Sequence, residues 1–177
     1  MELKFARQIN TYFCKTMSTA NYKSVFEALQ ALFNDSKPFV ISGLEKCCEL
    51  LRQRFDHYDW VGFYFADFNT ETLHLKAFSG IPTDHTSIPF GKGICGQVAL
   101  SHQNFMVPDV QDQDNYIACS IDVRSELVVP LFFEGKNIGQ IDIDSNKINP
   151  FSKEDEQLLE ACCDLISSTY GSSLLHI

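Results

Sequence analysis

Residues 126–144 read ELVVPLFFEGKNIGQIDID, and this stretch decides the fold class. Two strand-like apolar runs, 126–133 and 137–144, flank the short link Glu134-Gly135-Lys136. A glycine-containing link of this kind between two such runs is typical of a β-hairpin. The sequence therefore predicts a pair of antiparallel strands here.

A second hairpin is expected upstream, formed by residues 60–65 and 72–78. Polar and apolar side chains alternate along 72–78, as they do in a strand with one buried face. Residues 67–71 contain the polar side chains of a turn. The two hairpins together predict an antiparallel sheet.

Helical patterns stand on both sides of these strands. Apolar side chains recur every three or four residues in 22–33 and in 41–55, with a loop expected at 34–38. Ser152-Lys153-Glu154-Asp155 has the pattern of a helix N-terminus, and an apolar helical stripe follows at 158–166. This order predicts an α+β domain in which N- and C-terminal helices back a central antiparallel sheet.

Two long segments, 79–96 and 108–124, fit neither regular pattern. The first is rich in glycine and proline, and a short helix is expected to leave it from Gly93 to Ala99. Loops held by a rigid scaffold are where binding residues concentrate. We therefore expect the functional site beside these segments.

The composition favours one globular domain over residues 1–177. The chain is 45% hydrophobic and 21% charged, which is enough apolar material for a packed core. Its net charge of −9 repels phosphate backbones and anionic lipid, so no nucleic acid and no membrane partner is expected. The longest apolar run is far shorter than the roughly 20 residues of a membrane span. With no apolar signal region at its N-terminus, the protein is expected to be cytoplasmic.

Asp142 and Asp144 form the first candidate site. Alternate residues of a strand share a face, so both carboxylates point the same way. A three-residue link in the hairpin would place Glu126 opposite Asp144 on that face, whereas a two-residue link would turn it away. Converging carboxylates require a substrate ammonium, a metal, shared protons or water. The alternative is a solvated surface of an acidic protein.

Trp60 and Tyr64 form the second candidate site. Four residues apart in a strand, they share a face with Gly62 between them, which predicts a slot walled by aromatic rings. Such a slot suits a small apolar group. Ordinary core packing in a protein with 15 Phe is the alternative.

The chain has seven cysteines, an odd number without C-x-x-C spacing, which disfavours a disulfide scaffold or zinc ribbon. Cys95 stands where a glycine-rich loop enters a helix, and there the helix N-terminus and Lys92 would stabilise a reactive thiolate. Cys119 lies in an irregular segment, so simple packing explains it less well. The other five cysteines fall in helical patterns and are expected to pack as small apolar side chains: Cys14, Cys47, Cys48, Cys162 and Cys163. The five histidines lack zinc-ligand spacing, and neither a metal nor a cofactor is expected.

Six motifs, taken in order, resemble the free methionine-R-sulfoxide reductases, which are single GAF domains. They are DWVGFY at 59–64, IPFGKGICG at 88–96, VPDV at 107–110, IAC at 117–119, RSELVVPL at 124–131 and IGQIDIDS at 138–145. The resemblance covers about residues 20–170 and implies a GAF-like fold with about six strands. It also implies a cytoplasmic oxidoreductase that reduces free L-methionine-(R)-S-oxide, and it suggests a homodimer.

The resemblance assigns roles to the isolated residues. Cys119 would be the nucleophile that attacks the sulfoxide sulfur and becomes a sulfenic acid. The acidic residues would receive the substrate ammonium and help to protonate the sulfoxide oxygen, and the two aromatic residues would hold the methyl end. These substrate-binding residues are Trp60, Tyr64, Glu126, Asp142 and Asp144.

The recycling step departs from the family pattern. A second thiol would close a disulfide with Cys119, and thioredoxin or another thiol would reduce it. The usual resolving cysteine is replaced near His85, so Cys95 or an external thiol such as glutathione would resolve instead. His85 would lower the pKa of the Cys119 thiol if the two were adjacent; an exposed loop histidine is the alternative. Two other functions stay open: a non-catalytic GAF domain that binds an amino-acid-like ligand, and a thiol redox sensor formed by Cys95 and Cys119.

Overall fold

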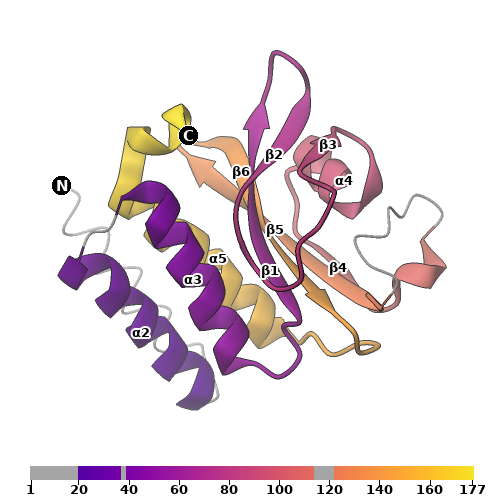
Figure 1. Ribbon diagram of the computed structural model, residues 1–177, viewed down its shortest axis with the longest axis horizontal. Coiled ribbons are helices and arrows are strands. Elements are labelled where there is room, and N and C mark those ends of the chain that lie inside the picture. The colour runs from indigo at the N-terminus through magenta and orange to yellow at the C-terminus, as the bar shows by residue number, and fades with distance from the viewer. Residues whose placement is uncertain (1–19, 37–38, 114–121) are drawn as a thin grey trace.

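The computed structural model describes residues 20–36, 39–113 and 122–177. Its core is a six-stranded antiparallel sheet in the order β3-β2-β1-β6-β5-β4. Helices cover both faces of this sheet, as Figure 1 shows. The GAF-like α+β class expected from the sequence is confirmed.

Both predicted hairpins are present. β1 (Trp60–Asp67) pairs with β2 (Thr72–Ser79), and β5 (Ser125–Phe133) pairs with β6 (Lys136–Ser145). β1 also pairs with β6, and this contact joins the two hairpins into one sheet. The chain's most strongly patterned strands therefore form the centre of the sheet.

The two edge strands were not predicted individually. β3 (Ser87–Pro89) and β4 (Phe105–Val107) have three residues each, too few to show an alternating pattern. β3 lies inside the expected irregular segment 79–96, and it is held by pairing with β2. The implied total of about six strands is nevertheless confirmed.

The link between β5 and β6 is shorter than the three residues considered above. Phe133 pairs with Lys136, so only Glu134 and Gly135 connect the strands. Both have positive φ, 49° and 77°, as a tight hairpin turn requires. On a regular ladder this turn would place Glu126 on the face away from Asp144.

A β-bulge reverses that outcome. The register shifts after Leu131 because Ile138 of β6 has no partner in β5. Glu126 consequently pairs with Asp144, and both side chains project from the same face. Without the bulge Glu126 would pair with Ile143. The predicted convergence is present, although the link length that was expected to produce it is wrong.

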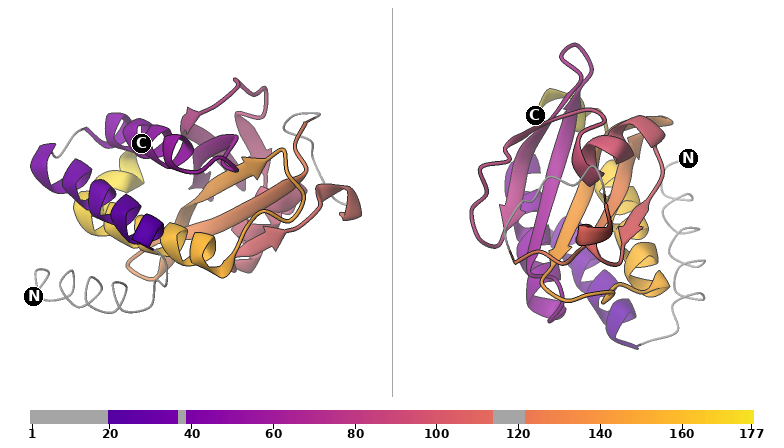
Figure 2. Two further views of the ribbon diagram at one scale, coloured as in Figure 1. Left: turned by 90° about the horizontal axis from the view of Figure 1, so that it is seen from below. Right: turned by 90° about the vertical axis from the view of Figure 1, so that its right-hand side faces the viewer.

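Three helices lie on one side of the sheet, two of them packed on its strands and the third packed on those two helices (Figures 1 and 2). They are α2 (Ala20–Ser36), α3 (Val40–Arg54) and α5 (Lys153–Tyr170), and a 3-10 segment, Gly171–His176, follows α5. Their apolar stripes and the inward side chains of the central strands form the larger core cluster. The helices at both ends of the domain are therefore as predicted, except that α2 continues into the expected loop. None of the described helices combines the length and apolar character that a membrane span requires.

A smaller set of elements covers the opposite face. α4 (Gly93–Ser101) begins at the predicted residue and packs on β5 and β6. A second apolar cluster lies between this cover and the sheet, and it includes Trp60, Tyr64 and Val128. This thinner layer covers the face on which the acidic side chains lie.

Asp155 anchors the N-terminus of α5. Its carboxylate accepts hydrogen bonds from the backbone N–H of Ser152 at 2.7 Å, from the Tyr58 hydroxyl at 2.9 Å and from His57 Nε2 at 3.0 Å. Ser152 completes a capping box by accepting from the Asp155 backbone N–H. Because His57 and Tyr58 immediately precede β1, this network fixes the helix layer to the sheet.

We predict that Asp155→Asn lowers the free energy of unfolding by about 2 kcal/mol at pH 7, because several hydrogen bonds to a buried carboxylate are lost or weakened. Burial raises the pKa of Asp155, but the bonds from His57, Ser152 and Tyr58 outweigh it and leave the pKa below its usual range. This stabilisation exists above the unfolded-state pKa and is lost as the pH falls through the folded-state pKa. Urea denaturation should therefore show a smaller difference in unfolding free energy between wild type and Asp155→Asn at pH 3 than at pH 7. The exposed Asp164→Asn on the same helix is the control, and equal stability of Asp155→Asn and wild type at pH 7 would contradict the prediction.

Candidate functional site

Three carboxylates lie together on the face of the sheet that α4 covers. Glu126 comes from β5, and Asp142 and Asp144 come from β6. Asp144 pairs with Glu126, while Asp142 lies one step along the same face beside Gly62 of β1. Their exposures are 2%, 0% and 2%, so this acidic cluster is buried. The alternative of a solvated acidic surface is wrong.

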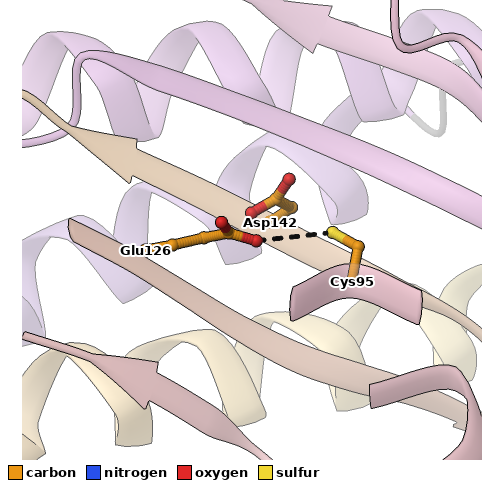
Figure 3. Close-up of side chains that lie close together, drawn as sticks. All are labelled: Cys95, Glu126 and Asp142. Atoms are coloured by element: carbon orange, nitrogen blue, oxygen red, sulfur yellow. Dashed lines mark hydrogen bonds between the residues drawn. The ribbon is translucent and has the colours of Figure 1, made fainter. Parts of the chain in front are cut away.

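Cys95 reaches the acidic cluster from α4. It is the third residue of that helix and is 3% exposed. Its Sγ donates a hydrogen bond to Glu126 Oε1 at 3.7 Å. Figure 3 shows the thiol and the carboxylates of Glu126 and Asp142 pointing into one space, with one atom of each within 4.8 Å of the others. Cys95 is thus at a helix N-terminus, as predicted, but beside negative groups rather than Lys92 alone.

Burial dominates the electrostatics of the acidic cluster. It raises the pKa of Glu126 and Asp144 well above the usual range, and neighbouring carboxylates add to both shifts. Burial also raises the pKa of Asp142, to about 7, against the lowering effect of the nearby Cys95 thiol. In the described ranges no lysine, arginine or histidine forms an ion pair with these carboxylates. The site therefore favours either bound protons or a positively charged ligand.

Several buried polar atoms at this face have no hydrogen-bond partner within residues 20–36, 39–113 and 122–177. They are Trp60 Nε1, both oxygens of Asp142, Oδ1 of Asp144 and both amide atoms of Gln140. Buried polar groups are rarely left without partners in proteins. Such a concentration indicates a place where a polar ligand or water is bound.

Gln140 was missed by the sequence reasoning. It lies two residues before Asp142, so it shares the acidic face, and it pairs with Tyr64 of β1. Its exposure is 0%. The same alternation that identifies Asp142 and Asp144 also places Gln140 on this face, but its neutral amide lacks the charge that marks the two aspartates as candidate site residues.

Trp60 and Tyr64 share the face, with ring centroids 6.3 Å apart. The slot expected above Gly62 is filled by the Trp60 ring itself, which lies so close that a Cβ at Gly62 would collide with it. Trp60 also stacks against Phe78 at 5.9 Å. Glycine is therefore required at position 62 for the ring to lie flat over β1.

His85 borders the same site. The Tyr64 hydroxyl donates to the His85 carbonyl at 2.9 Å, which ties the loop before β3 to the sheet. A small cavity of about 10 Å³, room for about one water molecule, is lined in part by His85, Lys92, Cys95 and Glu126. The His85 Nδ1 atom is buried and lacks a hydrogen-bond partner in the described part of the chain. An exposed loop histidine is therefore the wrong description of His85.

Cys119, the predicted nucleophile, lies outside the described residues, so its role and its disulfide pairing with Cys95 stay predictions. Cys14 lies outside them as well. The remaining four cysteines are buried in the core on the helical side of the sheet: Cys47, Cys48, Cys162 and Cys163. Their predicted role in packing is consistent with this position, and Cys47 Sγ lies 3.4 Å from Cys162 Sγ.

Comparison with known proteins agrees with this architecture. The sequence profile of the GAF domain family matches residues 43–169. The chain is 34% identical over 143 residues to "Free methionine-R-sulfoxide reductase" of Escherichia coli, covering 81% of this chain and 82% of that protein. It is 38% identical over 128 residues to "GAF domain-containing protein A" of Dictyostelium discoideum, covering 72% and 79%.

A solved structure shares the fold along most of the chain. The free methionine-R-sulfoxide reductase of Neisseria meningitidis, solved in complex with its substrate, is 31% identical and superposes with a TM-score of 0.81, over 92% of this chain and 96% of that one. The family match over residues 43–169 includes the strands and the helix that carry Cys95, Glu126, Asp142 and Asp144. This chain belongs to the free methionine-R-sulfoxide reductases, a family of GAF domain oxidoreductases.

Proposed function

We propose that this protein reduces free methionine-(R)-S-oxide to methionine. The observation that carries the proposal is the buried acidic cluster of Glu126, Asp142 and Asp144, for which the described residues provide no cationic partner. A free amino acid carries an α-ammonium, which would supply that charge and donate up to three hydrogen bonds. The names of the relatives from Escherichia coli and Neisseria meningitidis support the same substrate.

The remaining features suit the other end of the substrate. Trp60 and Tyr64 offer aromatic surface for the methyl group, and the unsatisfied Trp60 Nε1 is a hydrogen-bond donor. A protonated carboxyl group can also donate to the sulfoxide oxygen. Asp142 is suited to this task because its pKa of about 7 leaves a share of it protonated near neutral pH.

Cys119 carries the chemical step in this proposal. Its thiolate attacks the sulfoxide sulfur, the sulfur–oxygen bond of the substrate breaks, and the oxygen ends on the cysteine as a sulfenic acid. The substrate sulfur is reduced by two electrons and the cysteine sulfur is oxidised by two. A proton supplied at the sulfoxide oxygen completes the balance, and methionine leaves.

Cys95 is proposed to resolve the sulfenic acid. Its thiol attacks the Cys119 sulfur, a disulfide forms, and the oxygen leaves as water. Thioredoxin or a small thiol then reduces the disulfide by exchange, which regenerates both thiols. His85 occupies the loop position where the family usually has its resolving cysteine, so Cys95 would act alone in this chain.

We predict opposite kinetic outcomes for the two cysteine variants. Cys119→Ser should lose turnover at least about 100-fold, because a hydroxyl cannot accept the oxygen. Cys95→Ser should still release one methionine per protein chain in a single turnover, and should then stop with thioredoxin as reductant. Methionine release would be followed by quenched-flow chromatography, with dithiothreitol and with thioredoxin, its reductase and NADPH.

Cys163→Ser is the matched control, since Cys163 is 4% exposed and lies on the opposite side of the sheet. Wild-type turnover by Cys119→Ser would contradict the mechanism. Absence of turnover in the wild type, together with saturable binding of methionine sulfoxide, would instead establish a ligand-binding GAF domain. A Cys95–Cys119 disulfide formed by peroxide in a protein without turnover would favour the redox sensor.

Asp144→Asn should raise KM about tenfold or more while the protein stays folded, because it removes part of the negative charge proposed to bind the ammonium. Removing a buried like charge beside Glu126 should leave the unfolding free energy unchanged or raise it. Initial rates and urea denaturation measure the two quantities. Asp164→Asn makes the same change of net charge on the exposed face of α5 and should leave KM unchanged. An unchanged KM in Asp144→Asn would remove this residue from the substrate site.

A homodimer also stays a prediction. Within one chain Leu158 and Ile166 of the α5 stripe are 0% exposed and Leu165 is partly buried against the core, so the domain core accounts for most of the stripe without a partner. Light scattering of the purified protein would decide, and a monomeric mass would refute the dimer.

A further inference from the structure

We propose that Cys95, Glu126 and Asp142 form a binding site for a divalent transition metal ion of the zinc type. They contribute one thiol sulfur and two carboxylate oxygens, all within 4.8 Å of one another and all buried. They come from α4, β5 and β6, so the metal would connect the covering helix to the sheet.

The distances suit tetrahedral coordination. Zinc binds cysteine sulfur at about 2.3 Å and carboxylate oxygen at about 2.1 Å, so neighbouring ligand atoms on a tetrahedral ion stand about 3.6 Å apart. Cys95 Sγ and Glu126 Oε1 are already separated by 3.7 Å. Asp142 lies within the 4.8 Å limit and needs to approach by at most about 1.4 Å to complete three ligands.

Asp142 gives an independent reason to expect a ligand. It is 0% exposed, and neither of its oxygens has hydrogen-bond geometry with a described residue. A buried carboxylate with both oxygens unsatisfied is costly, and metal coordination is one of the few ways to satisfy it. In Figure 3 its side chain points into the space between the Glu126 carboxylate and the Cys95 thiol.

His85 is the candidate for the fourth position. It lines the cavity that Cys95 and Glu126 also line, and its Nδ1 atom is buried without a partner among the described residues. An imidazole nitrogen is a common zinc ligand, and a water molecule would fill this position otherwise. The Tyr64 hydroxyl donates to the His85 carbonyl and so holds the His85 backbone beside this cavity.

The ligand types select the metal. Thiolate and imidazole favour zinc and similar transition metals over magnesium and calcium, which prefer oxygen alone. Two carboxylates and a thiolate carry three negative charges, which more than balance the two positive charges of the ion. A zinc ion here would occupy Cys95 and the acidic cluster, so it would inhibit the reductase; this consequence alone depends on the proposed function.

The test measures zinc binding to the reduced, chelator-treated protein without substrate, by competition with a chromophoric chelator. Wild type should bind one Zn²⁺ per chain, and Cys95→Ser and Asp142→Asn should each weaken binding at least about tenfold. Co²⁺ should produce a thiolate-to-cobalt charge-transfer band that Cys95→Ser abolishes. His176→Ala, which removes an exposed histidine, and Cys163→Ser are the controls and should bind as wild type does.

Thermal melts with Zn²⁺ and with Mg²⁺ keep the result interpretable if a variant is less stable. Zinc should raise the midpoint of wild type and not that of Asp142→Asn, and magnesium should raise neither. Wild-type zinc affinity in Cys95→Ser or Asp142→Asn would overturn the proposal. Loss of binding in Cys119→Ser combined with full binding in Cys95→Ser would also overturn it. Because no substrate is present, failure of the reductase assay would leave this measurement unaffected.

Discussion

The functional face depends on burying three carboxylates that no cationic side chain in the described part of the chain pairs. Glu126, Asp142 and Asp144 are each almost fully excluded from water, and burial raises the pKa of each one. A domain of marginal stability retains such a cluster at a cost, since well-packed apolar side chains there would stabilise it more. The cost is understandable if the cluster exists to receive positive charge. The aromatic neighbours, the covering helix and the nearby thiol all lie around this cluster, so the roles proposed for them depend on that requirement.

The convergence of these carboxylates depends in turn on one extra residue. Ile138 is unpaired in the β5–β6 ladder, and this bulge puts Glu126 opposite Asp144. The bulge lies far along the hairpin from the carboxylates, close to the turn. A change of register at one point shifts every pairing beyond it. The bulge at one end of the ladder therefore determines which side chains share the acidic face at the other end.

The sequence was sufficient for the central strands, the flanking helices and the shared face of the acidic and aromatic residues. Each of these depends on a periodicity that several residues repeat, as in the alternation of Ile141, Asp142, Ile143 and Asp144. It was insufficient for β3 and β4, whose three residues cannot repeat a pattern, and for the turn length, because a bulge is not visible in hydrophobic alternation. The contact of Cys95 with Glu126 joins elements 31 positions apart and depends on how α4 packs, which is a tertiary property.

The positions of the other described thiols determine whether they could take part in the redox chemistry proposed for Cys95. Cys47, Cys48, Cys162 and Cys163 are on the helical side of the sheet, whereas Cys95 is on the opposite side. A continuous, hydrogen-bonded layer of six strands stands between the two groups. A disulfide can form only when two sulfur atoms come into contact. The sheet therefore prevents the thiols on one side from reacting with those on the other. An oxidised Cys95 sulfur cannot exchange with these four core thiols unless the domain unfolds, so the thiol chemistry proposed for Cys95 would stay separate from the core.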